Sequence, residues 1–221
     1  MQAAWPEALR HQVQVLVDQF LGNAAWIGID GIATLGVHGG FGTMRLGGRL
    51  EALGGQPLAR AFVWVQGTEP ELWVSQTDPG YRALFDEFAK ARLSLPGRPM
   101  GSGWNIDHAF PKAAAAADGL SHVRLLAIAA GGNQAAGRTL EKAMAGRAAT
   151  ARGGKRIRQA TWMTIGKAAG FEGWTELPDE AAAGNAAVVR RLFDHLAAHG
   201  ITAPAGALEE QLTAATLGRI R

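Results

Sequence analysis

The chain contains no cysteine. This absence excludes a disulfide scaffold, a zinc site built on thiolates and a thiol nucleophile. A chain without thiols is indifferent to the redox state of its surroundings, so the absence leaves the compartment open.

Long apolar runs are missing as well. Residues 20–44 carry Asp30 as their only formal charge, but glycines interrupt them throughout. A membrane-spanning helix needs about 20 consecutive, mostly apolar residues, so we interpret this stretch as short buried strands and turns. The N-terminus also lacks the basic region and apolar segment of a cleaved signal peptide. We expect a soluble protein without a membrane partner, either cytoplasmic or delivered into a target cell without a cleaved signal peptide.

Several common cofactor and nucleophile motifs are absent too. Gly154-Lys155 is followed by Arg156, where a phosphate-binding loop requires Ser or Thr. Ser102 lies in the stretch Met-Gly-Ser-Gly, which lacks the first glycine of a nucleophile elbow. A nucleotide-binding loop of this kind and a serine-hydrolase elbow are therefore excluded.

The composition is that of a globular protein, with 48% apolar and 19% charged residues in a chain of 221. The spacing of apolar residues predicts helices at 6–20 and 81–93, and a hairpin of strands at 61–65 and 72–74. The same reasoning predicts further strands at 26–29 and 32–37, and C-terminal helices at 179–199 and 207–217.

An α+β fold with four consecutive regions is the expected organisation. Glycine and tryptophan are frequent in the first region, and the second is a linker rich in glycine and proline. The expected regions are an N-terminal α+β accessory region at 1–95, a linker at 96–103, a central module with a basic extension at 104–158, and C-terminal helices at 159–221.

The central module contains a group of candidate catalytic and metal-binding residues. An extended stretch carries Asp107-His108 within the letters Asn-Ile-Asp-His-Ala-Phe-Pro, and a second begins at His122 within Ser-His-Val-Arg-Leu-Leu. The following helix, expected at 133–147, opens with Asn133. The predicted order is strand, loop, strand, helix. In this order of residues and elements, residues 104–147 resemble the HNH nucleases of the ββα-metal superfamily.

The resemblance implies a metal-dependent endonuclease that hydrolyses phosphodiester bonds, with DNA as the favoured substrate. Asp107 and Asn133 would hold one divalent cation, with Mg²⁺ as the first expectation and Mn²⁺, Ni²⁺ or Zn²⁺ as alternatives. His108 would be the general base that deprotonates water, since imidazole titrates near neutral pH. His122 would orient His108 or complete the shell of the metal.

A basic segment follows the candidate metal helix directly. Residues 138–158 contain seven basic residues against Glu141 alone, a net charge of +6, whereas the whole chain carries only +3. Concentrated positive charge is what binding to a phosphate backbone requires. The candidate nucleic-acid-binding residues are Arg124, Arg138, Lys142, Arg147, Arg152, Lys155, Arg156 and Arg158.

By the same resemblance, the chain could serve as an antibacterial toxin or effector, and an acidic immunity protein would then be its partner. Two alternatives remain open. One is a non-catalytic nucleic-acid-binding protein that uses the basic segment and buries its histidines. The other is a binding module in the N-terminal half, with a pocket lined by Trp26, Trp64 and Trp73.

Overall fold

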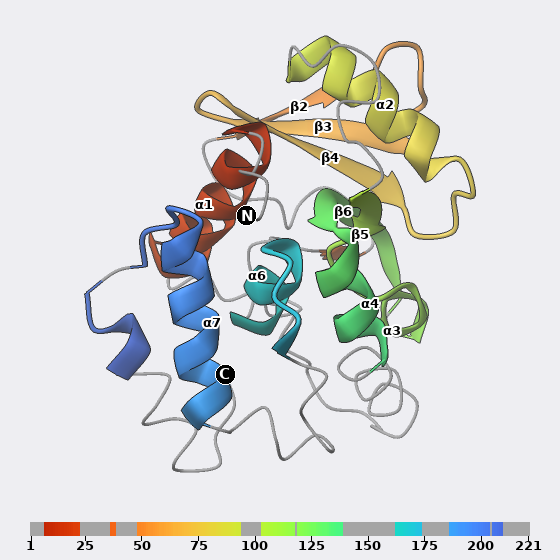
Figure 1. Ribbon diagram of the computed structural model, residues 1–221. Coiled ribbons are helices and arrows are strands. Elements are labelled where there is room, and N and C mark those ends of the chain that lie inside the picture. The colour runs from red at the N-terminus through yellow and green to blue at the C-terminus, as the bar shows by residue number, and fades with distance from the viewer. Residues whose placement is uncertain are drawn as a thin grey trace. The chain divides into compact units, whose positions relative to one another are not determined.

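Figure 1 shows the computed structural model of the chain. Its elements fall into two compact units, which we call the sheet unit and the helical unit. The sheet unit contains the strands together with α2 and α3, and the helical unit contains α1, α4, α6 and α7. The structure describes residues 7–22, 36–38, 48–93, 103–117, 119–138, 162–173, 186–203 and 205–209.

One six-stranded sheet forms the centre of the sheet unit, in the order β1-β6-β4-β3-β2, with β5 also paired to β6. The pairs β2–β3, β3–β4, β4–β6 and β1–β6 are antiparallel. The strands are β1 (Gly36–His38), β2 (Gly48–Ala52), β3 (Ala61–Gln66), β4 (Glu69–Ser75), β5 (Trp104–His108) and β6 (Leu120–Ala129).

The hairpin predicted from the sequence is confirmed in β3 and β4, which pair along their whole length. Gly67 and Thr68 form the connection between the two strands. Gly67 has a φ of 62°, a left-handed conformation that glycine adopts without steric cost. The tight loop fixes the register, so that Phe62 lies opposite Trp73.

One face of this sheet carries a cluster of aromatic residues. Side chains alternate between the two faces of a strand, and directly opposed residues share a face. Phe62, Trp64 and Trp73 therefore lie together, and the Phe62 and Trp73 rings stack with their centroids 6.0 Å apart. Both tryptophans are buried in the core, with Leu50 packed against them. The tryptophan pocket considered above is therefore wrong for Trp64 and Trp73, and Trp26 lies outside the described residues.

Helix α2 (Tyr81–Arg92) belongs to the opposite face. It contacts β4 and buries Leu84, Phe85 and Phe88. In its last turn Arg92 forms an ion pair with Glu51. Glu51 lies opposite Val63 in the β2–β3 register, so it shares the face that carries Val63 rather than the aromatic cluster. Figure 1 shows α2 lying along β3 and β4.

The helical unit is organised around α6 (Trp162–Ala168), which contacts α1 (Glu7–Gly22) and α4 (Ala130–Arg138). Gly132 of α4 has no room for a side chain, because a Cβ there would overlap the backbone of Gly170 just beyond α6. Close packing of the two segments therefore depends on this glycine.

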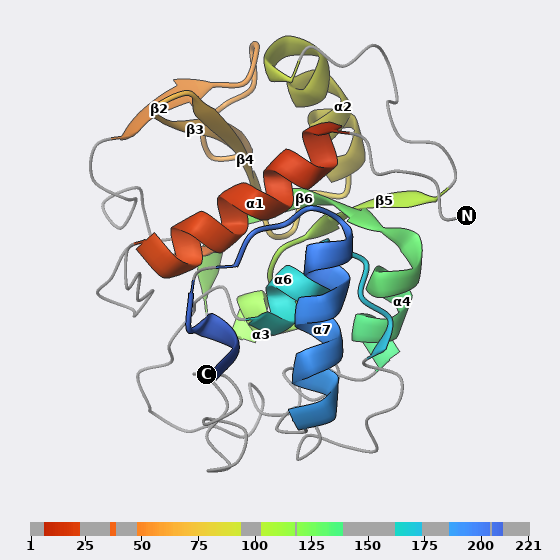
Figure 2. The same ribbon diagram turned by 60° about the vertical axis from the view of Figure 1, so that its left-hand side comes forward.

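Helix α7 (Ala186–Ala198) lies next to α6 in both Figure 1 and Figure 2. The His195 Nε2 is 2.6 Å from the backbone oxygen of Ala169, which follows α6 directly. The His195 ring also packs edge-on against Phe171. His195 thus joins α7 to the end of α6.

Most predicted elements in the described part of the chain are confirmed, with shifted ends. The helices predicted at 6–20 and 81–93 are α1 and α2, and the extended stretches of the central module are β5 and β6. The loop expected between β5 and β6 is wrong in part, because Lys112–Ala117 forms the short helix α3. Alanine has the highest helix propensity of all residues, which explains a helix over the run of alanines.

Other expectations reach into residues outside the described ranges. Of the strand predicted at 32–37, the structure describes Gly36 and Val37 within β1. The helix predicted from Asn133 begins three residues earlier, as α4, and its predicted end lies outside the described residues. The same holds for the strand at 26–29, for the beginning of the helix at 179–199, and for most of the helix at 207–217.

Gly48 provides a test of the aromatic face. A Cβ at this position would overlap the indole ring of the buried Trp64. We expect Gly48→Ala to lower the free energy of unfolding by about 1–3 kcal/mol, which is typical of overpacking a core. Gly55→Ala is the matched control, because a Cβ at Gly55 meets no atom within 4 Å. Equal urea midpoints for the two variants would contradict the packing described here.

Candidate functional site

Asp107 and His108 are the last two residues of β5. Just beyond the strand, the Ala109 N–H donates a hydrogen bond of 2.9 Å to the backbone oxygen of Arg124 on β6. The Asp107 side chain is 25% exposed, the His108 side chain only 2%, and the Oδ1 and Nδ1 atoms of the two are 3.9 Å apart. Consecutive residues of a regular strand point to opposite faces, so the end of the strand is where both can contribute to one site.

The His108 ring packs against Tyr81, the first residue of α2. The two ring centroids are 4.7 Å apart, with the planes inclined by 57°. Two cations also lie over the Tyr81 ring, the Lys112 Nζ at 4.5 Å from its centroid and the Arg82 Cζ at 4.7 Å. We call Tyr81, Arg82, Asp107, His108 and Lys112 the Tyr81 cluster. All five belong to the sheet unit.

The Tyr81 hydroxyl remains protonated at neutral pH. Burial raises the pKa of the phenol, the nearby guanidinium of Arg82 opposes this, and the negative charge of Asp107 adds to it. Tyr81 therefore contributes an aromatic ring and a neutral hydroxyl beside His108.

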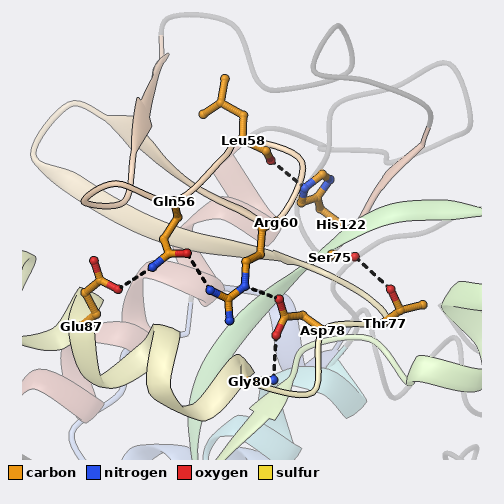
Figure 3. A network of polar contacts seen from close by, with 9 residues as sticks. All are labelled: Gln56, Leu58, Arg60, Ser75, Thr77, Asp78, Gly80, Glu87 and His122. Carbon is orange, nitrogen blue, oxygen red and sulfur yellow. Dashed lines mark hydrogen bonds and ion pairs between the residues drawn. The ribbon is translucent and has the colours of Figure 1, made fainter.

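His122 is a core residue with its own partners. Its Nε2 lies 3.0 Å from the Leu58 backbone oxygen and its Nδ1 lies 3.1 Å from the Ser121 hydroxyl oxygen. A carbonyl oxygen only accepts hydrogen bonds, so Nε2 carries the proton and Nδ1 accepts from the hydroxyl. The imidazole also packs edge-on against Phe62 at 5.1 Å. Figure 3 shows the His122 ring directed toward Leu58.

The two histidines of the predicted site lie on opposite faces of the sheet. His122 packs on Phe62, which belongs to the aromatic face. His108 packs on Tyr81, which begins the helix whose last turn is ion-paired to Glu51 of the other face. The structure therefore does not bring His122 beside His108. Its predicted part in orienting the base or completing a metal shell has no support in this arrangement.

Arg124 is buried as well, at 4% exposure, and pairs with the carboxylate of Glu71 at 3.5 Å. The Trp73 Nε1 donates a second hydrogen bond to Glu71, at 3.2 Å. Trp73 lies opposite Arg124 in the β4–β6 register, so the ion pair belongs to the aromatic face. A phosphate cannot reach a guanidinium in this position, and the structure places Arg124 in the core instead of on a nucleic-acid-binding surface.

The remaining predicted residues lie elsewhere. Asn133 is half-buried in the first turn of α4, in the helical unit. Arg138 is the last residue of α4. The other basic candidates, Lys142, Arg147, Arg152, Lys155, Arg156 and Arg158, lie outside the described residues.

A network of polar contacts beside the Tyr81 cluster holds the start of α2, as Figure 3 shows. The Arg60 Nε donates to Asp78 Oδ2 at 2.6 Å, and Asp78 Oδ1 accepts from the Gly80 N–H at 2.6 Å. The hydrogen bond from Arg60 holds the pKa of the Asp78 carboxyl below its usual value, with Gly80, the charge of Arg60 and that of Lys112 acting in the same direction against partial burial. The Arg60–Asp78 ion pair and the hydrogen bond from the Gly80 N–H to Asp78 therefore fix the loop before Tyr81.

Within the described ranges, no group of three or more His, Asp or Glu side chains is gathered as a metal site would need. No helix in this part of the chain is both long and apolar enough to cross a membrane. Comparisons with protein-family models, curated proteins and solved structures gave no match for this chain. The sequence analysis does not identify Tyr81, Arg82 or Lys112 as neighbours of the Asp107-His108 pair. The one sequence signal is that Lys112 follows Pro111, which lies three residues after His108.

The buried ion pair gives a first prediction for this region. Arg124→Met leaves the Glu71 carboxylate in the core without its cation, which typically costs about 3–5 kcal/mol of unfolding free energy. The double variant Glu71→Leu/Arg124→Met removes both charges and is expected to recover most of this loss. Urea denaturation followed by tryptophan fluorescence measures both effects.

Arg49→Met is the control for the ion pair, because Arg49 is 65% exposed and pairs with Glu51 at the surface. It should change stability little. If Arg124→Met kept full stability but weakened nucleic-acid binding, the assignment of Arg124 to the core would be wrong.

His122 gives a prediction on pH. Burial lowers the pKa of its imidazole, although backbone hydrogen bonds at Leu58 and Ala59 oppose the shift. As the pH falls below about 6.5, where an unfolded histidine titrates, the unfolded chain binds a proton that the folded chain resists. The neutral His122 imidazole therefore contributes fully to the free energy of unfolding above that pH. This contribution is lost as the pH falls toward the lower pKa of His122 in the folded protein.

The variant His122→Gln carries no titrating group at this position. Urea unfolding at pH 7.5, 6.5 and 5.5 should show a larger loss of stability on acidification for the unmodified protein than for the variant. His199, whose pKa is also lowered by burial and by His195, is common to both proteins and cancels in the difference. Parallel pH profiles would mean that His122 is not held neutral by the fold.

Proposed function

We propose that the chain is a metal-dependent endonuclease in which Asp107 and His108 act at the end of β5, with Asn133 expected from the family resemblance as a second metal ligand. The observation that carries the proposal is the order and pairing of the elements. β5, which ends in Asp107-His108, pairs with β6, and β6 runs without interruption into α4, where Asn133 lies in the first turn. Two paired strands followed by a helix, with these residues in this order, support the resemblance to the ββα-metal module.

The available ligand atoms fit a hard divalent cation. Asp107 offers a carboxylate at the end of its strand, a quarter exposed, and the family resemblance adds the amide oxygen of Asn133. Mg²⁺ prefers oxygen ligands of these two kinds. When bound, such a cation neutralises charge that develops on a phosphate and on its leaving oxygen.

The protein's own residues would supply the proton transfer. Imidazole is the side chain best suited to accept a proton from water near neutral pH. The Asp107 carboxylate, 3.9 Å from the His108 Nδ1, would stabilise the imidazolium that results. The Tyr81 ring, in contact with His108, limits the directions in which the imidazole can turn. His122 and Arg124 have no part in this scheme, because both are buried on the aromatic face.

The substrate is nucleic acid, with DNA favoured. The supporting observation is the net charge of +6 over residues 138–158, which directly follow α4 and suit a polyanion. A role as a delivered antibacterial effector, with an acidic immunity protein as its partner, extends this proposal by family resemblance.

A second candidate is a non-catalytic nucleic-acid-binding protein. The observation that favours it is the burial of both histidines, since His108 and His122 are 2% and 5% exposed. A general base must come within hydrogen-bonding distance of the water that it deprotonates. Binding that needs no metal, without any cleavage, would favour this candidate.

Plasmid nicking tests the proposal. Purified protein is incubated with supercoiled plasmid and Mg²⁺, Mn²⁺, Ni²⁺, Zn²⁺ or EDTA, and with an RNA control. We expect metal-dependent nicking that falls at least about a hundredfold in His108→Gln, because general bases contribute rate factors of this size. Asp107→Asn should fall similarly through weaker metal binding.

His11→Gln serves as the matched control, since His11 is an exposed histidine on α1. Its activity should equal that of the unmodified protein. Because His108 is buried, thermal denaturation must show that its variant is folded, and the partly exposed Asp107 provides an independent variant. Cleavage that survives both substitutions, or the absence of cleavage with every metal, overturns the proposal.

A further inference from the structure

The Tyr81 cluster contains two exposed cations that the scheme above does not use. Lys112 begins α3 and Arg82 is the second residue of α2, and both side chains are exposed. Their cations lie 4.5 Å and 4.7 Å from the centroid of one ring, that of Tyr81. Residues 30 positions apart in the sequence thus both place a positive charge against the Tyr81 ring.

These cations are held in position without being neutralised. Over the part of the chain that the structure describes, the contacts of Arg82 and Lys112 with other side chains are made to the Tyr81 ring, and neither residue takes part in an ion pair. A cation over an aromatic ring at an exposed site gains only about 0.5–1 kcal/mol. The ring therefore orients the two charges but leaves their hydrogen-bonding capacity for another partner.

The neighbouring carboxylates have other partners, although the charge of Lys112 also acts on Asp78. Asp78 accepts hydrogen bonds from the Arg60 Nε and from the Gly80 N–H, at 2.6 Å each. Asp107 lies 3.9 Å from the His108 Nδ1 and, under the proposed function, is a ligand of the divalent cation. Lys112 and Arg82 are thus the charges available to an anion at this place.

We propose that Lys112 and Arg82 bind the phosphodiester backbone of the nucleic acid and hold it beside His108, an inference that rests on the proposed nuclease function. A guanidinium can donate two parallel hydrogen bonds to one phosphate, and an ammonium group acts as a compact point charge. The same Tyr81 ring contacts His108 at 4.7 Å. The two cations and the proposed general base therefore all contact one ring, which is the geometric basis of the proposal.

Binding in the absence of metal tests the inference separately from catalysis. The affinity for a fluorescent 20-base-pair DNA duplex is measured by anisotropy in EDTA at several salt concentrations. We expect Lys112→Gln and Arg82→Gln each to weaken binding about fivefold, and the double variant more than about tenfold. The slope of log affinity against log salt concentration should fall by about 2 in the double variant, because two phosphate contacts are lost.

Lys90→Gln is the matched control, since Lys90 is an exposed cation on the same helix as Arg82. Its affinity and salt slope should change little. Lys112→Arg keeps the charge and should restore binding, which separates a role of charge from a role of packing. Thermal midpoints should change little, because the substituted side chains are exposed and the Gln variants each lose only a cation–π contact.

The outcomes separate this inference from the proposed function. If the unmodified protein cleaves but the double variant binds like Lys90→Gln, the phosphate-binding role of Lys112 and Arg82 is wrong and the proposed nuclease function is supported. If the double variant loses binding while no protein cleaves, the phosphate-binding role is supported and the proposed nuclease function is wrong. An unmodified protein that binds no duplex in EDTA would overturn the inference directly.

Discussion

The alternation of side chains along β6 determines what the residues of the sheet unit can do. β6 pairs with β4 and β1 over its first half and also pairs with β5, and its side chains are buried on both faces. On a strand in this position a residue has no route to solvent, and its partners are set by register alone. His122 and Arg124, two residues apart, therefore share the aromatic face with Phe62 and Trp73.

This constraint explains why charge and titrating groups occur in the core. A buried carboxylate without a cation would be strongly unfavourable, and the register supplies one by placing Arg124 beside Glu71. Trp73 adds a donor to the same carboxylate. For His122, the loop at Leu58 supplies an acceptor for the single proton of a neutral imidazole. Glu71, Trp73 and Arg124 satisfy one another on this face, and His122 bonds to Leu58 and Ser121, so these four side chains have little capacity left for chemistry.

The sequence predicts much of the fold, because hydrophobic periodicity is a local property. The hairpin of β3 and β4, helix α2 and the two strands of the central module all follow from it. Helix α3 is not predicted, because the loop expected between the two strands includes the run of alanines, although alanine favours a helix. The predicted start of α4 at Asn133 is three residues too late, because Gly131 and Gly132 resemble a turn. These glycines lie in the helix where a Cβ would overlap Glu172 or Gly170.

The candidate site was less accessible to sequence reasoning. The Asp107-His108 pair can be read from the letters, but the sequence does not state the face on which a neighbouring strand presents its residues. His122 is expected in the site from the family resemblance and Arg124 from its charge, and only the pairing of β6 with β4 shows that both belong to the core. Tyr81 lies 27 residues before His108 in the sequence, so their contact is a property of tertiary packing.

Asp107 and His108 have different surroundings, although both lie at the end of β5. The imidazole is packed against Tyr81, whereas the adjacent carboxylate is a quarter exposed. A carboxylate needs access to ligands or solvent to hold its charge, and an imidazole gains a defined orientation from an aromatic neighbour. Access to the pair is therefore better on the side of the carboxylate than on the side of the ring. Under the proposed nuclease function, an anionic substrate would approach Asp107 despite its charge, and Lys112 and Arg82 would supply positive charge that favours this approach.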